Sequence, residues 1–334
     1  MLPGKELKCK KYPFPGSILP IFIKIPSYIH LERDKKMTKS KADLKGIIVP
    51  IVTPLTDDEE LDVVSLEKLV NRMIHSGIQG IFIGGSMGEY PNLKEKVKFD
   101  LYEQSSCIAN EKLLKLANIS DNSEKKVLEN ISKIKKLAVD YYVLTAPYYF
   151  SYSQNDLKNF FLHIADSSDK PLLVYNIPIF VKHRLSRELI FSLMDHPNIV
   201  GLKDSSGEFS QFSRILMEKN SQFVVLQGIP ELVYSSFLLK CEGAIPGLGN
   251  LIPEKFERLF SYIIEEKIEL AKQLQLEINQ INQVFEQIGG IIAIKYALSL
   301  MNVCLPITTR PFPELTKNQK QIVEETLKNY QIQN

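Results

Sequence analysis

The chain has 334 residues, 44% of them hydrophobic, which is enough for one large domain with a substantial core or for two ordinary domains. Its formal net charge is only +2, but residues 1–45 carry 11 Lys/Arg and 4 Asp/Glu, whereas the remainder carries 30 and 35. The main body is therefore mildly acidic, and its charge gives no reason to expect nucleic-acid binding.

Residues 1–44 stand apart because they are basic. Their segment FPGSILPIFIKIPSYI is apolar, but three prolines and Lys24 interrupt it, so it is too short and too broken to span a bilayer. It also lacks a small-residue cleavage site after a clean apolar stretch, which makes a secretory signal peptide a weak interpretation. We predict a disordered leader or an upstream mis-start before Met37. Organelle targeting is the alternative, because the segment is basic.

From Lys45 onward, short apolar runs alternate with segments of helical period. The strand candidates are GIIVPIV (46–52), GIFIG (80–84), LLKLAN (113–118), YYVLT (141–145), LLVYN (172–176), IVGLK (199–203), FVVLQ (223–227) and GAIPG (243–247). Amphipathic stretches lie between them at 65–76, 94–109, 123–137, 154–168, 186–194, 208–219 and 230–240. The runs recur every roughly 20–34 residues, which suits one strand, one helix and two loops. This pattern predicts an α/β fold, a (β/α)8 barrel over residues 45–265.

After residue 252 no strand signal returns. Three further helical segments, 266–287, 290–301 and 316–331, predict a C-terminal helical extension packed on the barrel over residues 266–334. Pro306, Pro311 and Pro313 mark the break before the last of them. The first segment is strongly amphipathic, and we interpret its apolar face as a packing or oligomer contact.

Cysteine and histidine spacings give no metal-binding pattern. The cysteines are scattered without a C-x-x-C pair, which suits neither a zinc site nor a disulfide framework (Cys9, Cys107, Cys241, Cys304). The histidines show neither H-x-x-x-H nor H-E-x-x-H (His30, His75, His163, His183, His196). We therefore expect no metal site and a reducing, cytoplasmic setting.

Polar residues collect at the predicted strand ends, which meet at one mouth in a parallel barrel. GGSMGEY follows the second strand, APYY the fourth, Tyr175 lies on the fifth and Lys203 ends the sixth. A desolvated lysine has its pKa lowered, and a neutral amine can add to a carbonyl to form a Schiff base. Tyr175, on the neighbouring strand, can carry protons during that addition. We interpret Lys203 as a nucleophile; the alternative is a lysine that reaches solvent at the strand end.

These residues also carry a resemblance. GGSMGE, PYY, YNIP, GLKDSSGE and GAIPGLGNLIP, in this order, resemble the dihydrodipicolinate synthase/N-acetylneuraminate lyase family of pyruvate-type class I aldolases, from about Lys45 to Gln331. The resemblance implies a TIM barrel with C-terminal helices, usually a homotetramer, that joins or cleaves 2-oxo acids through a covalent lysine imine without a cofactor. The implied partners are a small-molecule 2-oxo acid and an aldehyde, with no nucleic acid and no membrane.

The resemblance also implies roles for four residues in catalysis. Lys203 matches the family's Schiff-base lysine, and Tyr175 its catalytic tyrosine. Ser86 matches the hydroxyl that hydrogen-bonds this tyrosine, and Tyr149 the residue that reaches across a dimer interface to complete a proton relay. The alternatives are buried tyrosines bonded to the backbone and a serine that only shapes a turn.

Further positions match the substrate-binding residues. Gly85, Ser86 and Met87 match the loop that holds the pyruvyl carboxylate, and Ile245 matches a position whose backbone carbonyl lies near the lysine. Met87 replaces a threonine or serine, so one carboxylate hydroxyl is missing and the backbone N–H remains. We expect Glu89 to shape this loop rather than to act in catalysis, and Asp204 to cap the turn after Lys203.

Other departures concern the second half of the substrate. Phe180 stands where the synthase branch has a carboxylate-binding arginine, and an aromatic ring cannot replace a bidentate cation. In Gly228-Ile229-Pro230-Glu231, Pro230 takes the place of an aspartate that holds the sialate polyol, and Gly247 that of a serine; Glu231 is retained. Dihydrodipicolinate synthase activity and N-acetylneuraminate lyase activity are therefore both disfavoured.

We predict a Schiff-base lyase that reversibly cleaves a 2-oxo acid, a 2-keto-3-deoxy sugar acid such as 2-keto-3-deoxygluconate, to pyruvate and an aldehyde. The alternatives within the family are 4-hydroxy-tetrahydrodipicolinate synthase and N-acetylneuraminate lyase activity. The alternative from a different class is a catalytically reduced barrel that binds a 2-oxo acid as a sensor, for which Met87 and Phe180 give modest support. A phosphate-binding sugar enzyme on the same fold would use the glycines of GAIPGLGN.

Overall fold

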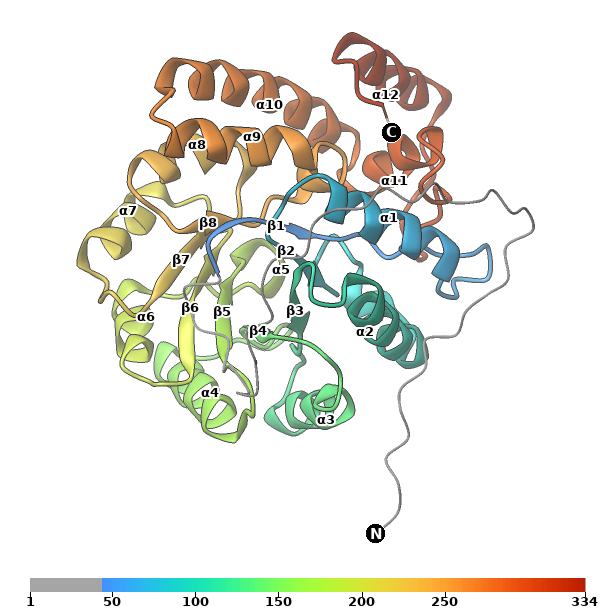
Figure 1. The fold of residues 1–334 in the computed structure, drawn as a ribbon. Coiled ribbons are helices and arrows are strands. Elements are labelled where there is room, and N and C mark those ends of the chain that lie inside the picture. The colour runs from blue at the N-terminus through green and yellow to red at the C-terminus, as the bar shows by residue number, and fades with distance from the viewer. Residues whose placement is uncertain (1–43, 334) are drawn as a thin grey trace, which may run out of the picture. The chain divides into compact units, whose positions relative to one another are not determined.

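Within residues 44–333, which the computed structural model describes, eight parallel strands close into a barrel in chain order (Figure 1). The strands are β1 (Gly46–Pro50), β2 (Gly80–Ile83), β3 (Leu114–Asn118), β4 (Tyr141–Thr145), β5 (Leu172–Asn176), β6 (Ile199–Asp204), β7 (Val224–Gln227) and β8 (Gly243–Ala244). The barrel closes where Gly46 and Ile47 on β1 pair with Gly243 and Ala244 on β8. The predicted fold is confirmed; the predicted leader, except for Leu44, lies outside the described residues.

The helices surround the strands as the alternating pattern predicts. They are α1 (Val63–His75), α2 (Glu95–Ala109), α3 (Glu124–Ile134), α4 (Gln154–Ser167), α5 (Pro178–Val181), α6 (Arg187–Met194), α7 (Phe209–Glu218), α8 (Val233–Leu238) and α9 (Pro253–Ile264). Local signals fix where several of them begin. Asp62 accepts a hydrogen bond from the Ser65 N–H at the start of α1, and Ser153 and Asp156 form a capping box at the start of α4.

Two details differ from the sequence pattern. The eighth apolar run yields only a two-residue strand, because Pro246 has no N–H to continue the ladder beyond Ile245. The Ile245 N–H still bonds the Gln227 carbonyl at 2.7 Å, so the chain follows the barrel one residue further. The short helix α5, directly after β5, was not predicted; its first residue, Pro178, suits the first turn of a helix.

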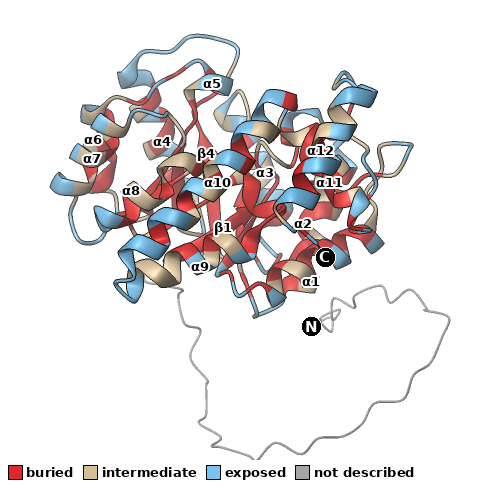
Figure 2. Ribbon diagram, turned by 90° about the horizontal axis from the view of Figure 1, so that it is seen from above, coloured by how far each residue is buried: buried red, intermediate tan, exposed pale blue. Residues whose placement is uncertain are grey.

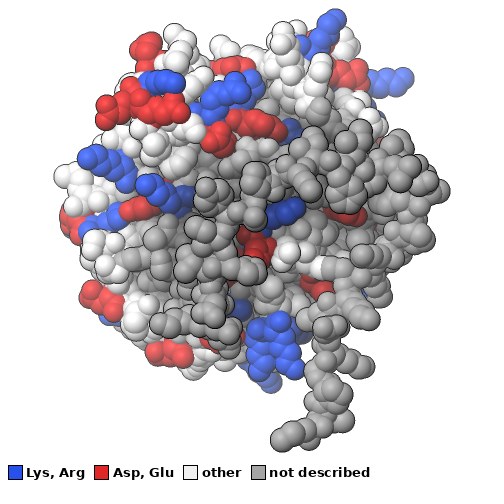
Figure 3. Space-filling model, in the orientation of Figure 1, with Lys and Arg blue, Asp and Glu red and all other residues white. Residues whose placement is uncertain are grey.

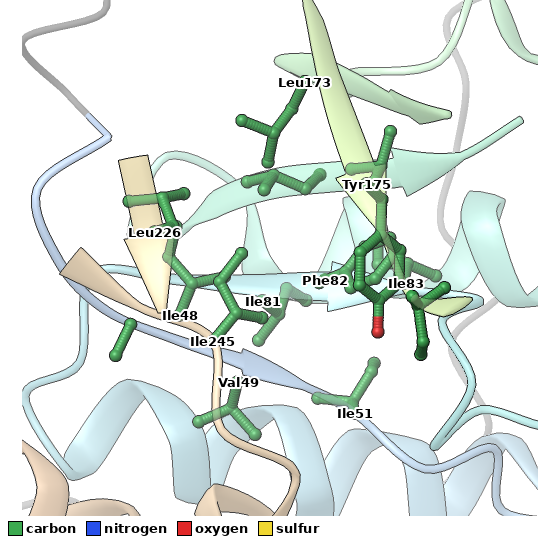
Figure 4. Close-up of a cluster of buried hydrophobic side chains, with 14 of the residues drawn as sticks. Ile48, Val49, Ile51, Ile81, Phe82, Ile83, Leu173, Tyr175, Leu226 and Ile245 are labelled. Atoms are coloured by element: carbon green, nitrogen blue, oxygen red, sulfur yellow. The ribbon is translucent and has the colours of Figure 1, made fainter. Parts of the chain in front are cut away.

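The core fills the inside of the barrel and the layer between strands and helices. Figure 4 shows side chains from several strands gathered inside the barrel, among them Ile48, Phe82, Leu173 and Leu226, all fully buried. The strands are buried on both faces, which explains why they read as continuous apolar runs rather than as alternating patterns. Figure 2 shows the exposed residues on the outer faces of the helices.

The last three helices form the predicted C-terminal extension: α10 (Ile268–Ile288), α11 (Ile291–Leu300) and α12 (Lys317–Asn329). Helix α10 lies along α9 and contacts α8, and its buried positions include Ile278, Ile281 and Phe285. Its apolar face is therefore a packing surface within the chain. Figure 3 shows acidic and basic side chains interspersed on the face that it displays. No helix among the described residues is long and apolar enough to cross a membrane.

Candidate active site

Lys203 and Tyr175 lie side by side at the end of the barrel where the strands finish. They are register partners on β6 and β5, and both side chains point into the barrel with 2% and 4% of their surface exposed. The Lys203 Nζ lies 4.0 Å from the centre of the Tyr175 ring and 4.8 Å from that of Phe82. The two rings meet edge to face at 6.1 Å, an arrangement visible in Figure 4. Lys203 is thus enclosed by aromatic surface.

This environment disfavours the charged form of the lysine. Burial lowers the pKa of Lys203, while the neighbouring Tyr175 acts in the opposite direction. No carboxylate among residues 44–333 forms an ion pair with Lys203. A ring face attracts a cation more weakly than a carboxylate does in a dry site. The site therefore favours a neutral amine, which is the nucleophilic form.

Asp204 follows Lys203 in sequence, but its side chain lies on the opposite face of the strand. Its carboxylate accepts hydrogen bonds from the Asn176 side chain at 2.8 Å and from the Ser206 N–H and hydroxyl at 2.9 and 2.6 Å. Burial raises the pKa of Asp204, and these hydrogen bonds oppose the change. Side chains alternate across a strand, so this carboxylate caps the turn, as predicted, and does not neutralise its neighbour.

The segment 84–89, which contains the predicted carboxylate-binding residues Gly85–Met87, is held in one shape by close packing. Gly84 has a φ of +70°, and a Cβ atom there would lie 2.8 Å from the Tyr102 hydroxyl. A Cβ on Gly85 would lie 2.7 Å from the Phe82 ring. The Thr53 hydroxyl donates to the Gly88 carbonyl at 2.7 Å, which fastens the loop to the segment after β1. The two close approaches, to Tyr102 and to Phe82, require glycine at positions 84 and 85.

The predicted proton relay is only partly assembled within one chain. Lys203 and Tyr175 are in contact, but no hydrogen bond joins Tyr175 to Ser86 or to Tyr149 among the described residues. Ser86 is half-buried in the loop after β2. Tyr149 is 75% exposed, has a φ of +88° and contacts the Phe150 ring edge to face. Its predicted role across a subunit interface stays a prediction.

The residues expected to face the second half of the substrate occupy different environments. Phe180 lies on α5 and is 60% exposed. The Gly228 N–H bonds the Asp204 carbonyl at 2.7 Å, and a Cβ there would lie 1.9 Å from the Ser205 hydroxyl, so glycine is required by backbone packing. Glu231 accepts a hydrogen bond from Asn282 on α10. Ile245 is buried on the strand side of the mouth.

Two of the departures noted in the sequence touch one another. A Cβ atom on Gly247 would lie 3.0 Å from the Met87 sulfur and 3.2 Å from its Cγ. Met87 therefore packs directly over Gly247, and a serine at 247 would require the methionine to move. Sequence reasoning found both positions but not their contact, because they are 160 residues apart on β2 and β8 loops.

Sequence reasoning missed the partner of Glu89. The Glu89 carboxylate and the Lys295 ammonium are both completely buried and lie 2.5 Å apart. The signal was present, because Lys295 interrupts the apolar helix IIAIKYALSL just as Lys203 ends the apolar strand IVGLK. No group of three or more His, Cys, Asp or Glu side chains suited to a metal ion occurs in the described part of the chain.

Comparisons with known proteins agree with this geometry. A family model described as the dihydrodipicolinate synthetase family matches residues 43–330. A 4-hydroxy-tetrahydrodipicolinate synthase of Thermodesulfovibrio yellowstonii is 27% identical over 285 residues, covering 85% of this chain and 98% of that protein. An N-acetylneuraminate lyase of Rhizobium meliloti is 28% identical over 269 residues, covering 80% and 89%.

Solved structures give the same result. A chloride-inhibited dihydrodipicolinate synthase from Acinetobacter baumannii, complexed with pyruvate, superposes with a TM-score of 0.83 at 28% identity. The match covers 86% of this chain and 99% of that one. The relatives thus carry two different activity names at similar identity, and the comparison leaves the substrate open.

Proposed function

This chain belongs to the dihydrodipicolinate synthetase family, and we propose that it is a class I aldolase that reversibly cleaves a 2-keto-3-deoxy sugar acid to pyruvate and a short hydroxyaldehyde. Enzymes of this family are carbon–carbon lyases that use a lysine Schiff base with pyruvate rather than an external cofactor. One observation carries the proposal for this chain: Lys203 is buried against the Tyr175 and Phe82 rings without a carboxylate partner among residues 44–333.

The proposed reaction begins with the neutral Lys203 amine. It attacks the 2-oxo carbon of the substrate, and loss of water gives an imine. The protonated imine accepts the electron pair of the C3–C4 bond as that bond breaks, the C4 hydroxyl loses its proton, and the aldehyde leaves. The resulting enamine takes a proton at C3, and water releases pyruvate and the free lysine. In this proposal the Tyr175 hydroxyl, on the strand next to Lys203, moves these protons.

The substrate's carboxylate is assigned to the loop Gly85–Met87. Since Met87 offers no hydroxyl, backbone N–H groups and Ser86 carry this contact in the proposal. The relative from Acinetobacter baumannii, which is complexed with pyruvate, supports a pyruvyl group as the part of the substrate that the family shares.

The second half of the substrate is assigned from the departures at the rim. No cation stands at Phe180 to pair with the carboxylate of an amino-aldehyde, and an unpaired carboxylate in the site costs about 1–3 kcal/mol or more. Met87 covers Gly247, which closes the position that a polyol-binding serine would use. Glu231 is partly engaged by Asn282 and keeps acceptor capacity for a shorter hydroxyl chain. These features favour a short polyhydroxy 2-oxo acid.

The proposal includes a homo-oligomer, a tetramer as is usual in the family, in a cytoplasmic setting. Several large apolar side chains in the loop after β4 and on α5 are exposed in the single chain: Tyr149 by 75%, Phe150 by 64%, Ile179 by 78% and Phe180 by 60%. Exposed large apolar side chains that cluster mark interaction surfaces, and Tyr149 and Phe150, like Ile179 and Phe180, are neighbours in the chain. A second copy that covers this surface would bring Tyr149 toward a neighbouring mouth.

Borohydride reduction in the presence of pyruvate, followed by intact mass measurement, tests the imine. We expect one reduced pyruvyl adduct per chain; a 2-oxo acid sensor that binds without covalent chemistry gives none. Pyruvate release from 2-keto-3-deoxygluconate and from N-acetylneuraminate is then compared with pyruvate consumption in the presence of aspartate semialdehyde. The highest kcat/KM is expected for 2-keto-3-deoxygluconate, and preference for aspartate semialdehyde would contradict the weight placed on Phe180.

A further inference from the structure

Glu89 ends the loop that is assigned to the substrate's carboxylate, and all its side-chain contacts lead away from the barrel. One carboxylate oxygen lies 2.5 Å from the Lys295 Nζ on α11. The other accepts hydrogen bonds from the Thr309 N–H at 2.7 Å and from the Thr309 hydroxyl at 2.8 Å. Lys295 also donates to the Ile307 carbonyl at 2.6 Å. The carboxylate therefore connects the loop to two separate pieces of the C-terminal extension.

Contacts on the barrel side also hold the loop that contains Gly85–Met87. Glu89 has a φ of +57°, a left-handed conformation, and its N–H bonds the Ser86 carbonyl at 3.0 Å. The preceding Gly88 carbonyl accepts from Thr53. Ser86 and Met87 thus lie in a tight turn between one anchor on the segment after β1 and one anchor on the C-terminal extension. Any shift of Glu89 moves the backbone N–H groups of this turn.

A buried ion pair adds little to the stability of a fold. Two apolar residues of similar size are often as stable or more stable, because both charges must leave water. Burial lowers the pKa of Lys295, and the nearby Glu89 carboxylate raises it again, so the lysine depends on this one partner. A charged, hydrogen-bonded carboxylate also has a fixed orientation, since its three contacts, with the Lys295 Nζ and with the N–H and hydroxyl of Thr309, fix where the turn lies.

We propose that Glu89 and Lys295 are positioning residues that hold the Gly85–Met87 turn for the carboxylate of the 2-oxo acid, so that the C-terminal helices are part of the active-site apparatus. This role rests on the proposed function of Lys203. It requires no contact between either residue and the substrate. In this proposal α11 and residues 307–309 hold the turn through Glu89 in addition to covering the barrel.

The test measures how much pyruvate half-saturates adduct formation at Lys203. In the double variant Glu89→Met/Lys295→Met both charges are gone, so no charge is left buried and unpaired. We expect the pyruvate concentration for half-maximal borohydride trapping to rise about 10- to 100-fold, as for a binding group displaced by about 1 Å. Trapping at saturating pyruvate is expected to remain complete, because Lys203 is untouched.

A matched control uses a second buried ion pair at the other end of the barrel. Lys115 on β3 lies 3.7 Å from Asp140, which precedes β4. The variant Lys115→Met/Asp140→Met removes a pair of the same kind far from the mouth. We expect its half-saturating pyruvate to match the wild-type value. An equal rise in the control would show general softening of the fold and would overturn the positioning role.

A milder variant tests the positioning role of Glu89 even if the double variant does not fold. Thr309→Val removes the hydroxyl's hydrogen bond to Glu89 and the one that it accepts from the Asn92 side chain, and it leaves the ion pair and the Thr309 N–H contact. We expect its half-saturating pyruvate to rise about three- to tenfold with a melting temperature close to wild type. An unchanged value overturns the positioning role. A wild-type chain that traps no pyruvate overturns the proposed function instead, so the two failures are distinguishable.

Discussion

Two buried lysines of this chain occupy opposite electrostatic situations. Lys203 on β6 faces the rings of Tyr175 and Phe82, and no carboxylate in residues 44–333 pairs with it. Lys295 on α11 is buried to the same degree but lies 2.5 Å from Glu89. Burial lowers the pKa of both, and among the described residues only Lys295 has a carboxylate partner that opposes this lowering. In the roles we propose, equal burial prepares one amine for reaction and the other for holding a loop.

The comparison teaches that burial alone does not identify a nucleophile. An unpaired buried ammonium is costly in the folded state, and its retention suggests use of the neutral form. A paired one is held charged and is unreactive toward carbonyls. Four predictions test this difference, beginning with the one whose effect is greatest.

Lys203→Arg is expected to abolish both turnover and the reduced pyruvyl adduct. A guanidinium stays protonated at any working pH and cannot add to a carbonyl. Intact mass after borohydride treatment and a pyruvate-release assay measure the two effects. Lys295→Arg serves as the comparison, because it keeps a charge beside Glu89 and leaves Lys203 free to be trapped. A Lys203→Arg protein that still forms the adduct would sink the assignment.

Tyr175→Phe is expected to lower kcat by about 10²–10⁴, the usual contribution of a positioned proton-transfer group. The substitution keeps the ring that lies 4.0 Å from the Lys203 Nζ and removes only the hydroxyl. It therefore separates the aromatic surroundings of the amine from proton transfer. Steady-state kinetics beside a normal melting temperature give the result. Unchanged turnover would show that Tyr175 is only a packed core residue.

Lys295→Met alone is expected to destabilise the fold by about 3–5 kcal/mol, because it leaves the Glu89 carboxylate buried without its cation. Urea unfolding followed by circular dichroism measures the change. The double variant with Glu89→Met is expected to recover part of the loss, since no unpaired charge remains. If the single and double variants are equally unstable, the unpaired Glu89 carboxylate is not the cause of the loss, and the two residues do not stabilise each other as their contact indicates.

The sequence was sufficient to predict the barrel, because each strand and helix has its own periodicity and parallel strands must bring their ends together. It also predicted Lys203 and Tyr175 as neighbours, since they end adjacent strands. It was not sufficient for the contact between Met87 and Gly247 or for the pairing of Glu89 with Lys295. Those contacts join loops and helices far apart in the chain, and no periodic pattern encodes them.

Lys203→Met is expected to stabilise the protein at neutral pH by about 1–3 kcal/mol, because it removes a buried amine that has no carboxylate partner among the described residues. The gain depends on pH, since the folded-state pKa of Lys203 is lowered below its ordinary value of 10.5. Below the folded-state pKa both states are protonated, and the wild type bears the full cost of the buried charge. Between the two pKa values the unfolded chain binds more protons than the folded one, so wild-type stability rises with pH and the advantage of methionine shrinks toward pH 10.5. Unfolding free energies of both proteins across this range measure the trend. A constant difference would mean that Lys203 titrates alike in the folded and unfolded states, and that the aromatic enclosure does not favour its neutral form.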